Sequence, residues 1–371
     1  MIRVAVLYGG RSGEHEVSLC SAASVISALD GSRYEVIAVG VDKAGVWHVQ
    51  DAPRIVESAE FGRVLAIDKT GPWLVNHYEQ GNRLVMTNPA GGKTVRADVV
   101  FPVLHGTYGE DGTLQGLLEL AMVPYVGADV LGASVGMDKD VAKRLLAAAG
   151  VPVVPWITVH KSEWASGRAS IEKKSVGALG LPLFVKPACT GSSVGITKVK
   201  DADMLGAAMD EAFRYDMRVL IEKAVDCREI ECAVLGNEDP RASVLGEIVP
   251  RHEFYSYEAK YIDPDGAELK IPAALSPELA DGIRAAARSG YLALGCSGMA
   301  RVDFFLEKIG TRFFLNEINT IPGFTSISMY PKLWEASGLK YADLLDRLIE
   351  LSLERHRARA SVQTDFSRRK R

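Results

Sequence analysis

The first 41 residues constrain the fold of this chain more than any other stretch. Residues 2–8 form an apolar run that ends in the glycine-rich turn Gly9–Gly13. A helix is expected to begin near Ser18, because apolar residues then recur at helical spacing as far as Asp30-Gly31. A second apolar strand follows at residues 34–41. Strand, helix and strand in this order form a βαβ unit, which predicts a doubly wound α/β sheet.

The polar residues that follow two of these strands suggest a binding site. Ligands of open α/β sheets lie beyond the carboxyl ends of the strands, where Glu14 and His105 are expected. An isolated histidine is more often a packed structural residue, but two polar turns at the same edge favour a site. The glycines do not have the GxGxxG spacing and no acidic residue completes the fingerprint, so we reject a nicotinamide-binding interpretation.

A charged β-hairpin is predicted for residues 299–323, where two apolar strands are joined by a turn. Side chains two apart share one face of a strand, so Arg301 and Asp303 point the same way. Glu317 and Asn319 are paired in the same manner on the second strand. Three oxygen ligands on one face suit Mg²⁺. A buried salt-bridge network around Arg301 is the alternative that these residues leave open.

A phosphate-binding loop is predicted at residues 187–195. This loop is rich in glycine and serine and lies between the apolar strands 181–186 and 196–199. Such a loop can place backbone N–H groups over phosphates. Lys186, the last residue of the first strand, adds a positive charge and strengthens the interpretation.

Composition limits the other classes of function. The net charge of −4 gives no reason to expect a nucleic-acid partner, and no apolar run approaches the length of a membrane span. The first residues enter a strand directly, so no signal peptide is expected. The five cysteines are far apart and form no CxxC pair, which is typical of reduced thiols in a cytoplasmic protein.

Six motifs follow one another in a specific order and spacing. They are Gly9-Gly10-x-Ser12-x-Glu14-His15-Glu16-Val17-Ser18, His105-Gly-x-x-Gly-Glu-Asp-Gly112, Met137-Asp-Lys139, Lys186-Pro-x-x-x-Gly-Ser192-Ser-Val-Gly195, Tyr257-Glu-Ala-Lys260-Tyr261 and Asn316-Glu317-x-Asn319-Thr-x-Pro-Gly323-x-Thr-x-x-Ser328. Each is modest alone. Together they make the chain resemble the D-alanine–D-alanine ligase family of ATP-grasp enzymes over roughly residues 2–355.

The resemblance implies α/β and α+β domains, with a Rossmann-like N-terminal domain followed by a two-subdomain ATP-grasp fold. The implied ranges are 1–136 for the first domain, with a β-rich insertion at about 43–98, then 137–225, 226–357 and a disordered tail at 358–371. The loops at 190–195 and 251–272 are expected to close over the substrates and exclude water.

The resemblance also implies a reaction. ATP would phosphorylate the carboxylate of one D-alanine, and the amine of a second D-alanine would attack the acyl phosphate, giving the dipeptide used for peptidoglycan. Two Mg²⁺ ions, for which Mn²⁺ may substitute, would assist phosphoryl transfer. Relatives are usually homodimers, so we expect a homodimer with no nucleic-acid or membrane partner.

The site residues implied by the resemblance fall into four groups. Those that bind ATP are Lys139, Lys186, Ser193, Glu222, Lys223, Val225 and Glu229, with the two lysines on the phosphates, Glu222, Lys223 and Val225 at the adenine and Glu229 on the ribose. The metal ligands are Asp303, Glu317 and Asn319. The catalytic group comprises the triad Glu14, Ser192 and Tyr261 together with Arg301 and Gly323, which would stabilise the oxyanion. The other substrate-binding residues are His105, Lys260 and Ser328.

Three alternatives remain at this point. A ligase of the same fold could use D-serine or D-lactate as acceptor. Tyr261 argues against D-lactate, because ester-forming relatives commonly change that position. A non-catalytic nucleotide-binding regulator would be expected to lose metal ligands or Arg301, and both are present. An amino-acid-binding module that uses no phosphate would have no need of the two lysines and three metal ligands.

Overall fold

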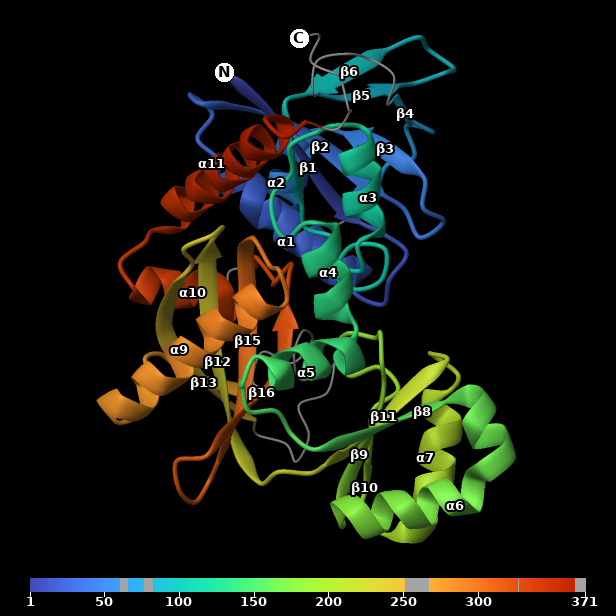
Figure 1. The fold of residues 1–371 in the computed structure, drawn as a ribbon. Helices are drawn as coiled ribbons and strands as arrows, with labels where there is room; N and C mark the ends of the chain where they lie inside the picture. The colour runs from blue at the N-terminus through green and yellow to red at the C-terminus, as the bar shows by residue number, and fades with distance from the viewer. Residues whose placement is uncertain (61–65, 77–82, 251–266, 326, 364–371) are drawn as a thin grey trace, which may run out of the picture.

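The structure is a computed structural model, and it describes residues 1–60, 66–76, 83–250, 267–325 and 327–363 (Figure 1). The N-terminal sheet has the strand order β3-β2-β1-β7. Its parallel strands are β1 (Ile2–Gly9), β2 (Tyr34–Val41) and β7 (Val99–Pro102), and β3 (Trp47–Gln50) is an antiparallel edge. The helix α1 (His15–Ala28) connects β1 to β2, which confirms the predicted βαβ unit.

The start of α1 differs from the prediction by three residues. We expected Ser18 near the first turn, but the helix already begins at His15. Ser18 is fully buried, and its hydroxyl accepts the N–H of Gly9 at 2.8 Å and donates to the carbonyl of Val103. This serine therefore ties the helix to the ends of β1 and β7, where the binding site was expected.

The expected β-rich insertion contains one helix that the sequence pattern did not predict. The strands β4 (Leu74–Asn76), β5 (Leu84–Thr87) and β6 (Thr94–Ala97) form a separate three-stranded sheet. The helix is α2 (Ala52–Glu60), and its residues Ile55 and Val56 pack against the core around α1. The sequence contains boundary signals for this helix, because Asp51 precedes it and Gly62 follows its end. A helix this short is marginal alone, so its packing against α1 also stabilises it.

The central region is an antiparallel sheet with helices on one side. Its strands are β8 (Trp156–His160), β9 (Leu183–Pro187), β10 (Thr197–Val199) and β11 (Arg218–Lys223), in the order β10-β9-β11-β8. The helices are α6 (Lys161–Leu179), η1 (Ala202–Met204) and α7 (Leu205–Ala212), and Figure 1 shows α6 and α7 beside this sheet. Residues of α6, α7 and the sheet share their own hydrophobic core.

The C-terminal sheet is antiparallel and carries the predicted hairpin. Its strands are β12 (Cys227–Gly236), β13 (Arg241–Pro250), β14 (Ala267–Lys270), β15 (Gly298–Glu307) and β16 (Phe313–Asn319), in the order β14-β13-β12-β15-β16. The pairing of β15 with β16 confirms the hairpin. The helices α9 (Pro277–Ala293) and α10 (Met329–Ala336) pack on residues from alternate positions of β12, and therefore on opposite faces.

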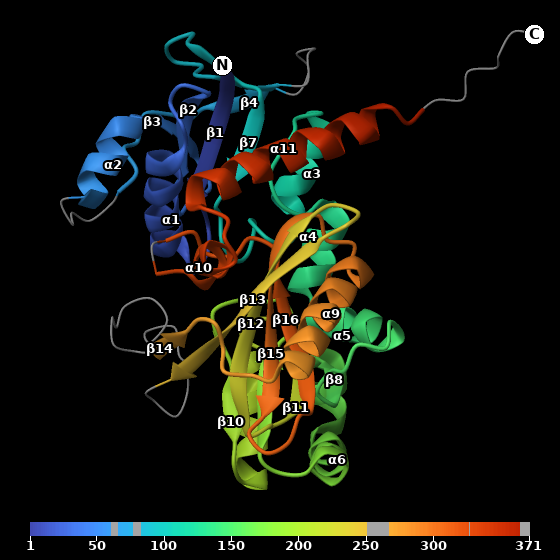
Figure 2. The same ribbon diagram turned by 90° about the vertical axis from the view of Figure 1, so that its left-hand side faces the viewer.

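Three of the remaining helices connect the N-terminal sheet to the central one, and the fourth is the last described element of the chain. They are α3 (Thr113–Leu120), α4 (Val130–Met137), α5 (Lys139–Ala148) and α11 (Tyr341–Ala360), and Figure 2 shows α11 crossing beside the N-terminal sheet. We expected α11 to end near Arg355 and the tail to begin at 358, but residues 358–360 are helical. Arg359 in this last turn contacts Glu119 at 2.9 Å, which supports the longer helix. Within the described residues, no helix has both the length and the apolar character needed to cross a bilayer.

Candidate active site

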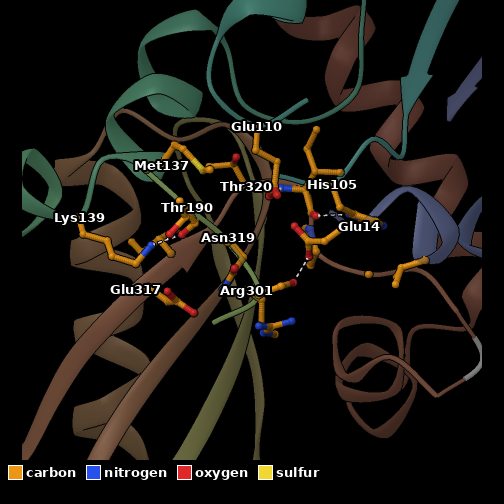
Figure 3. Close-up of a pocket in the computed structure, with 18 residues that line it drawn as sticks. Glu14, His105, Glu110, Met137, Lys139, Thr190, Arg301, Glu317, Asn319 and Thr320 are labelled. Atoms are coloured by element: carbon orange, nitrogen blue, oxygen red, sulfur yellow. Dashed lines mark hydrogen bonds between the residues drawn. The ribbon is translucent and has the colours of Figure 1, made fainter. Parts of the chain in front are cut away.

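A pocket lies where loops from the N-terminal, central and C-terminal regions meet (Figure 3). The predicted site residues that line it are Glu14, His105, Lys139, Ser192, Arg301, Glu317, Asn319 and Gly323. They come from segments that are far apart in sequence. The spacing of the motifs does not by itself show that these segments meet in space. Three further lining residues with acidic or hydroxyl side chains, Glu110, Thr190 and Thr320, were given no individual role from the sequence.

The N-terminal turn and the phosphate-binding loop are joined by a hydrogen bond from the hydroxyl of Ser192 to the carboxylate of Glu14. Ser192 and Ser193 adopt positive φ angles of 49° and 60°, which non-glycine residues rarely hold. A side chain at Gly195 would meet Tyr215 at 2.6 Å, so this turn requires glycine. The loop therefore has a specific backbone conformation beside Glu14.

The hairpin presents its polar residues as two neighbouring rungs. Arg301 pairs with Asn319 across the strands, and Asp303 pairs with Glu317. The guanidinium of Arg301 donates to both carboxylate oxygens of Asp303 at 2.7 Å, and the amide nitrogen of Asn319 donates to one of them at 2.9 Å. The salt-bridge network that the sequence left open as an alternative is thus present alongside the oxygen ligands.

The donor chemistry of this face fits a hard divalent cation. Asp303 and Glu317 offer carboxylate oxygens and Asn319 offers an amide oxygen, which are ligands that Mg²⁺ takes together with phosphates and water. Across the parts of the chain that the structure describes, no three His, Cys, Asp or Glu side chains already converge as a metal site. The residues fit the cation by type, and Asp303 would have to exchange its contact with Arg301 for one with the metal.

The first turn of α5 holds Lys139 at the pocket. Asp138 caps the helix by accepting the N–H groups of Asp140 and Val141 at 3.2 and 3.1 Å. The ammonium of Lys139 then reaches the carbonyl of Thr190 at 2.5 Å, as Figure 3 shows. This contact places a positive charge directly against the predicted phosphate-binding loop.

The second predicted phosphate-binding lysine belongs to a buried cluster of charges. Glu222 lies between Lys186 at 2.7 Å and Lys143 at 3.2 Å, and all three residues are less than 8% exposed. Burial alone would raise the pKa of Glu222, but the two ammonium groups outweigh it and lower the pKa to about 2. Burial lowers the pKa of Lys143. The side chain of Glu222 is therefore a counter-ion for the lysines, and sequence reasoning missed Lys143 altogether.

His105 joins the N-terminal region to the loop that follows the hairpin. Its Nδ1 lies 3.0 Å from the carbonyl of Ile321, and its Nε2 lies 3.1 Å from the hydroxyl of Ser21. Burial lowers the pKa of His105. A neutral ring with the proton on Nδ1 satisfies both contacts, because Nδ1 then donates to the carbonyl and Nε2 accepts from the hydroxyl. Ser21 in turn accepts the N–H of Phe324 at 3.3 Å.

Glu110 forms a second link to the same loop. Its carboxylate accepts the N–H of Ile321 at 2.9 Å and the N–H of Gly106 at 2.7 Å. Burial, and next the nearby carboxylate of Glu14, raise the pKa of Glu110 to about 8. Glu110 lies in a loop, so no helical or strand periodicity could predict that it is buried. In the sequence, only its place in the motif that begins at His105 points to a role.

Several predicted residues lie outside the pocket lining. Ser193 lies in the predicted phosphate-binding loop, and Glu229 lies on β12. Lys223 is exposed at the end of β11, and Val225, two residues further on, is half-buried. The hydroxyl of Ser328 accepts the N–H of Thr325 at 3.0 Å, close to Gly323. Lys260 and Tyr261 are outside the described residues, as is most of the predicted lid at 251–272.

Comparison with known proteins identifies the family on both halves of the chain. Residues 3–128 match the family described as D-ala D-ala ligase N-terminus, and residues 145–350 match D-ala D-ala ligase C-terminus. The D-alanine--D-alanine ligase A of Escherichia coli (strain K12) is 49% identical over 364 residues, covering 98% of this chain and 99% of that protein. The ligase A of Bradyrhizobium diazoefficiens is 51% identical over 368 residues, or 99% of each chain.

Solved structures agree with this assignment. The D-alanine-D-alanine ligase from Coxiella burnetii has a TM-score of 0.81 and 38% identity, and the match covers 97% of both chains. The VanG D-Ala:D-Ser ligase from Enterococcus faecalis has a TM-score of 0.82 and 37% identity, over 95% of this chain and 99% of that one. The predicted combination of a Rossmann-like domain with an ATP-grasp fold is confirmed. The chain belongs to the D-alanine–D-alanine ligase family.

Proposed function

We propose that this chain joins two molecules of D-alanine into D-alanyl-D-alanine at the expense of ATP, and so supplies the dipeptide for peptidoglycan synthesis. The observation that carries the proposal is the composition of one pocket. It combines the lysine Lys139 at a phosphate-binding loop, a carboxylate suited to an ammonium group at Glu14, and a guanidinium at Arg301. Such a pocket can hold a nucleotide phosphate next to an amino acid.

The reaction balances in two steps. A carboxylate oxygen of the first D-alanine attacks the γ-phosphorus of ATP, ADP leaves, and an acyl phosphate forms. The amine of the second D-alanine, as the free base, attacks the acyl carbon. The tetrahedral intermediate expels phosphate, which takes the transferred carboxylate oxygen with it, and the amine nitrogen loses a proton as the peptide bond forms.

Both steps require positive charges and backbone N–H donors. Lys139 and Lys186 would bind the nucleotide phosphates, whose transfer depends mainly on positioning and charge neutralisation. Glu14 would bind the ammonium of the first D-alanine. Arg301 and the N–H of Gly323 would stabilise the negative charge that develops on the acyl oxygen.

Asp303, Glu317 and Asn319 are the residues that would hold two Mg²⁺ ions, for which Mn²⁺ can substitute. When bound, these ions would neutralise negative charge on the nucleotide phosphates. The cross-strand positions of Asp303 and Glu317 support this assignment.

D-Alanine is the preferred acceptor in this proposal. The D-alanine ligases of Escherichia coli and Bradyrhizobium are 49% and 51% identical to this chain over nearly its full length, which supports the same acceptor. Tyr261 further argues against D-lactate. We also infer a homodimer, as is usual among relatives. We infer that it acts in the cytoplasm, and the free thiols of all five cysteines support that compartment.

Phosphate release with ATP and Mg²⁺ tests the function. D-Alanine alone is compared with D-alanine plus excess D-serine or D-lactate, and the products are identified by mass. Formation of D-alanyl-D-alanine that the competitors do not divert would support the proposal. A mixed product would support the proposed ligation reaction but reject D-alanine as the preferred acceptor. The absence of any phosphate release would favour a non-catalytic nucleotide-binding protein.

A further inference from the structure

The strand beside the hairpin adds a third carboxylate to the polar face of the sheet. Glu231 on β12 is the cross-strand partner of Asp303, which in turn pairs with Glu317 on β16. Paired residues share a face of the sheet, so these three acidic residues form one rung. Glu231 is only 6% exposed, between apolar neighbours in the strand. A buried carboxylate at this place is costly unless it has a function or a partner.

The guanidinium of Arg301 is shared by two of these carboxylates. Its Nε lies 3.1 Å from Glu231, and its Nε and Nη2 donate to the two oxygens of Asp303 at 2.7 Å. Arginine presents five N–H donors in a planar fork, so it can hold two carboxylates at once. Among the described residues, one guanidinium here contacts two carboxylates.

These contacts compete with the proposed metal site. Both oxygens of Asp303 accept hydrogen bonds from Arg301, and one also accepts from Asn319. A divalent cation needs an oxygen of Asp303, so cation binding must weaken the contact between Arg301 and Asp303. The guanidinium then requires another carboxylate to keep it at the pocket, and Glu231 is already within reach.

We propose that Glu231 is a positioning residue that retains Arg301 when Asp303 turns from the guanidinium to the metal. Glu231 thereby has two effects: it weakens the hold of Arg301 on Asp303, and it keeps the guanidinium directed at the developing oxyanion. The inference rests on the metal and oxyanion roles in the proposed function. Glu231 belongs to none of the predicted site groups, and the inference gives it a part in metal binding and in oxyanion stabilisation.

The same sheet offers a matched control. Glu247 on β13 is 7% exposed and forms a pair with Arg228, with contacts of 2.8 and 2.7 Å. Its cross-strand partner is Ile230, so Glu247 lies on the face opposite to Glu231. Glu247→Gln removes a comparable buried Glu–Arg pair at a position away from the pocket.

The test measures metal binding without turnover. Mn²⁺ is titrated calorimetrically into the enzyme with a non-hydrolysable ATP analogue, for the wild type and for Glu231→Gln, Glu231→Asp, Glu247→Gln and Glu317→Gln. We expect Glu231→Gln to bind Mn²⁺ about tenfold more weakly, because the carboxylate that competes with Asp303 for Arg301 is then lost. Glu231→Asp should recover part of the affinity, and Glu247→Gln should bind as the wild type does.

Steady-state kinetics provide the second measurement. Glu231→Gln should lower kcat about tenfold or more while the KM for D-alanine stays within about twofold. Unchanged Mn²⁺ affinity in both Glu231 variants, together with a loss of affinity in Glu317→Gln, would overturn the inference and leave the proposed function standing. Unchanged affinity in Glu317→Gln as well would reject the metal site itself, and the role of Glu231 with it.

Discussion

Lys143, Glu222 and Lys186 form a cluster that water scarcely reaches, in which two ammonium groups share one carboxylate. The two lysines keep Glu222 ionised, and Glu222 fixes the position of Lys186. A buried cluster with one surplus positive charge is suited to an anionic ligand such as a nucleotide phosphate. Because the stability of this cluster depends on its charge balance, removing a lysine and removing the glutamate should change the free energy of unfolding by different amounts.

Replacing Lys143 by methionine should destabilise the enzyme far less than replacing Glu222 by glutamine. Lys143→Met leaves one neutral pair, so we expect a loss of about 1–2 kcal/mol in the free energy of unfolding. Glu222→Gln leaves two buried ammonium groups without their counter-ion, so we expect a loss of about 3–5 kcal/mol. Urea denaturation measures both values. Equal losses would show that the carboxylate is not the centre of the cluster.

The raised pKa of Glu110 predicts a pH dependence of stability. A carboxyl whose pKa is about 8 in the folded chain and about 4.5 in the unfolded chain is protonated more readily when folded. Its contribution to stability is full below pH 4.5 and is lost as the pH rises toward 8. Glu110→Gln removes this titration and leaves one backbone N–H poorly matched, at a cost of about 1–3 kcal/mol.

We therefore expect the difference in unfolding free energy between the wild type and Glu110→Gln to be largest near pH 5 and to shrink toward pH 8. Urea denaturation at several pH values measures this difference. Groups that titrate equally in both proteins contribute nothing to the difference. A difference that stays constant or grows with pH would contradict the proposed protonation of Glu110.

Individual site residues were predictable where they belong to a motif or break a strand pattern. Arg301 and Asp303 stand out because they are charged residues in an otherwise apolar strand. Lys143 carries no such signal, because a lysine in an amphipathic helix usually faces water, and only the fold turns it inward. Glu231 does alternate with Glu229, but the spacing alone cannot show that it faces Arg301.

At the level of elements, the capped first turn of α5 should connect stability to the ATP binding that we propose for Lys139. Asp138 caps the helix and also pairs with Arg218 of β11. Asp138→Ala should cost about 1–2 kcal/mol of unfolding free energy and should raise the KM for ATP several-fold by loosening Lys139. Asp138→Asn retains the cap and should lose less stability. An unchanged KM for ATP in the alanine variant would show that the cap does not position Lys139.

The elements with strong periodicity were predicted, whereas their ends were often set by tertiary contacts. The βαβ unit and the charged hairpin follow from spacing alone. The early start of α1, the helix α2 and the extension of α11 to Ala360 depend on contacts with distant segments, such as Arg359 with Glu119. Sequence patterns contain no information on those partners.

At the scale of the whole molecule, the hydrophobic cores divide the chain unequally. One core combines residues of β1, β7, α10 and α11, and so joins the N-terminal and C-terminal regions. The central sheet has a separate core with α6 and α7. The two terminal regions should therefore unfold together, and the central region should open more easily.

Native-state hydrogen exchange of the full chain in low urea measures these openings. We expect the amides of β9 and β11 to exchange through an opening of lower free energy than those of β1 and α11. A non-hydrolysable ATP analogue should narrow the difference in opening free energy, because we propose that its phosphates bind the loop between β9 and β10. A single opening energy for all four elements would contradict this division.

Transfer of oxygen from substrate to phosphate tests the central claim most directly. The enzyme is supplied with ATP, Mg²⁺ and D-alanine whose carboxylate carries ¹⁸O, and the released phosphate and the dipeptide are analysed by mass. If the carboxylate is phosphorylated in this pocket, each phosphate that accompanies a D-alanyl-D-alanine should contain one ¹⁸O from the substrate. Unlabelled phosphate would mean that water, not D-alanine, attacks ATP, and would contradict the account.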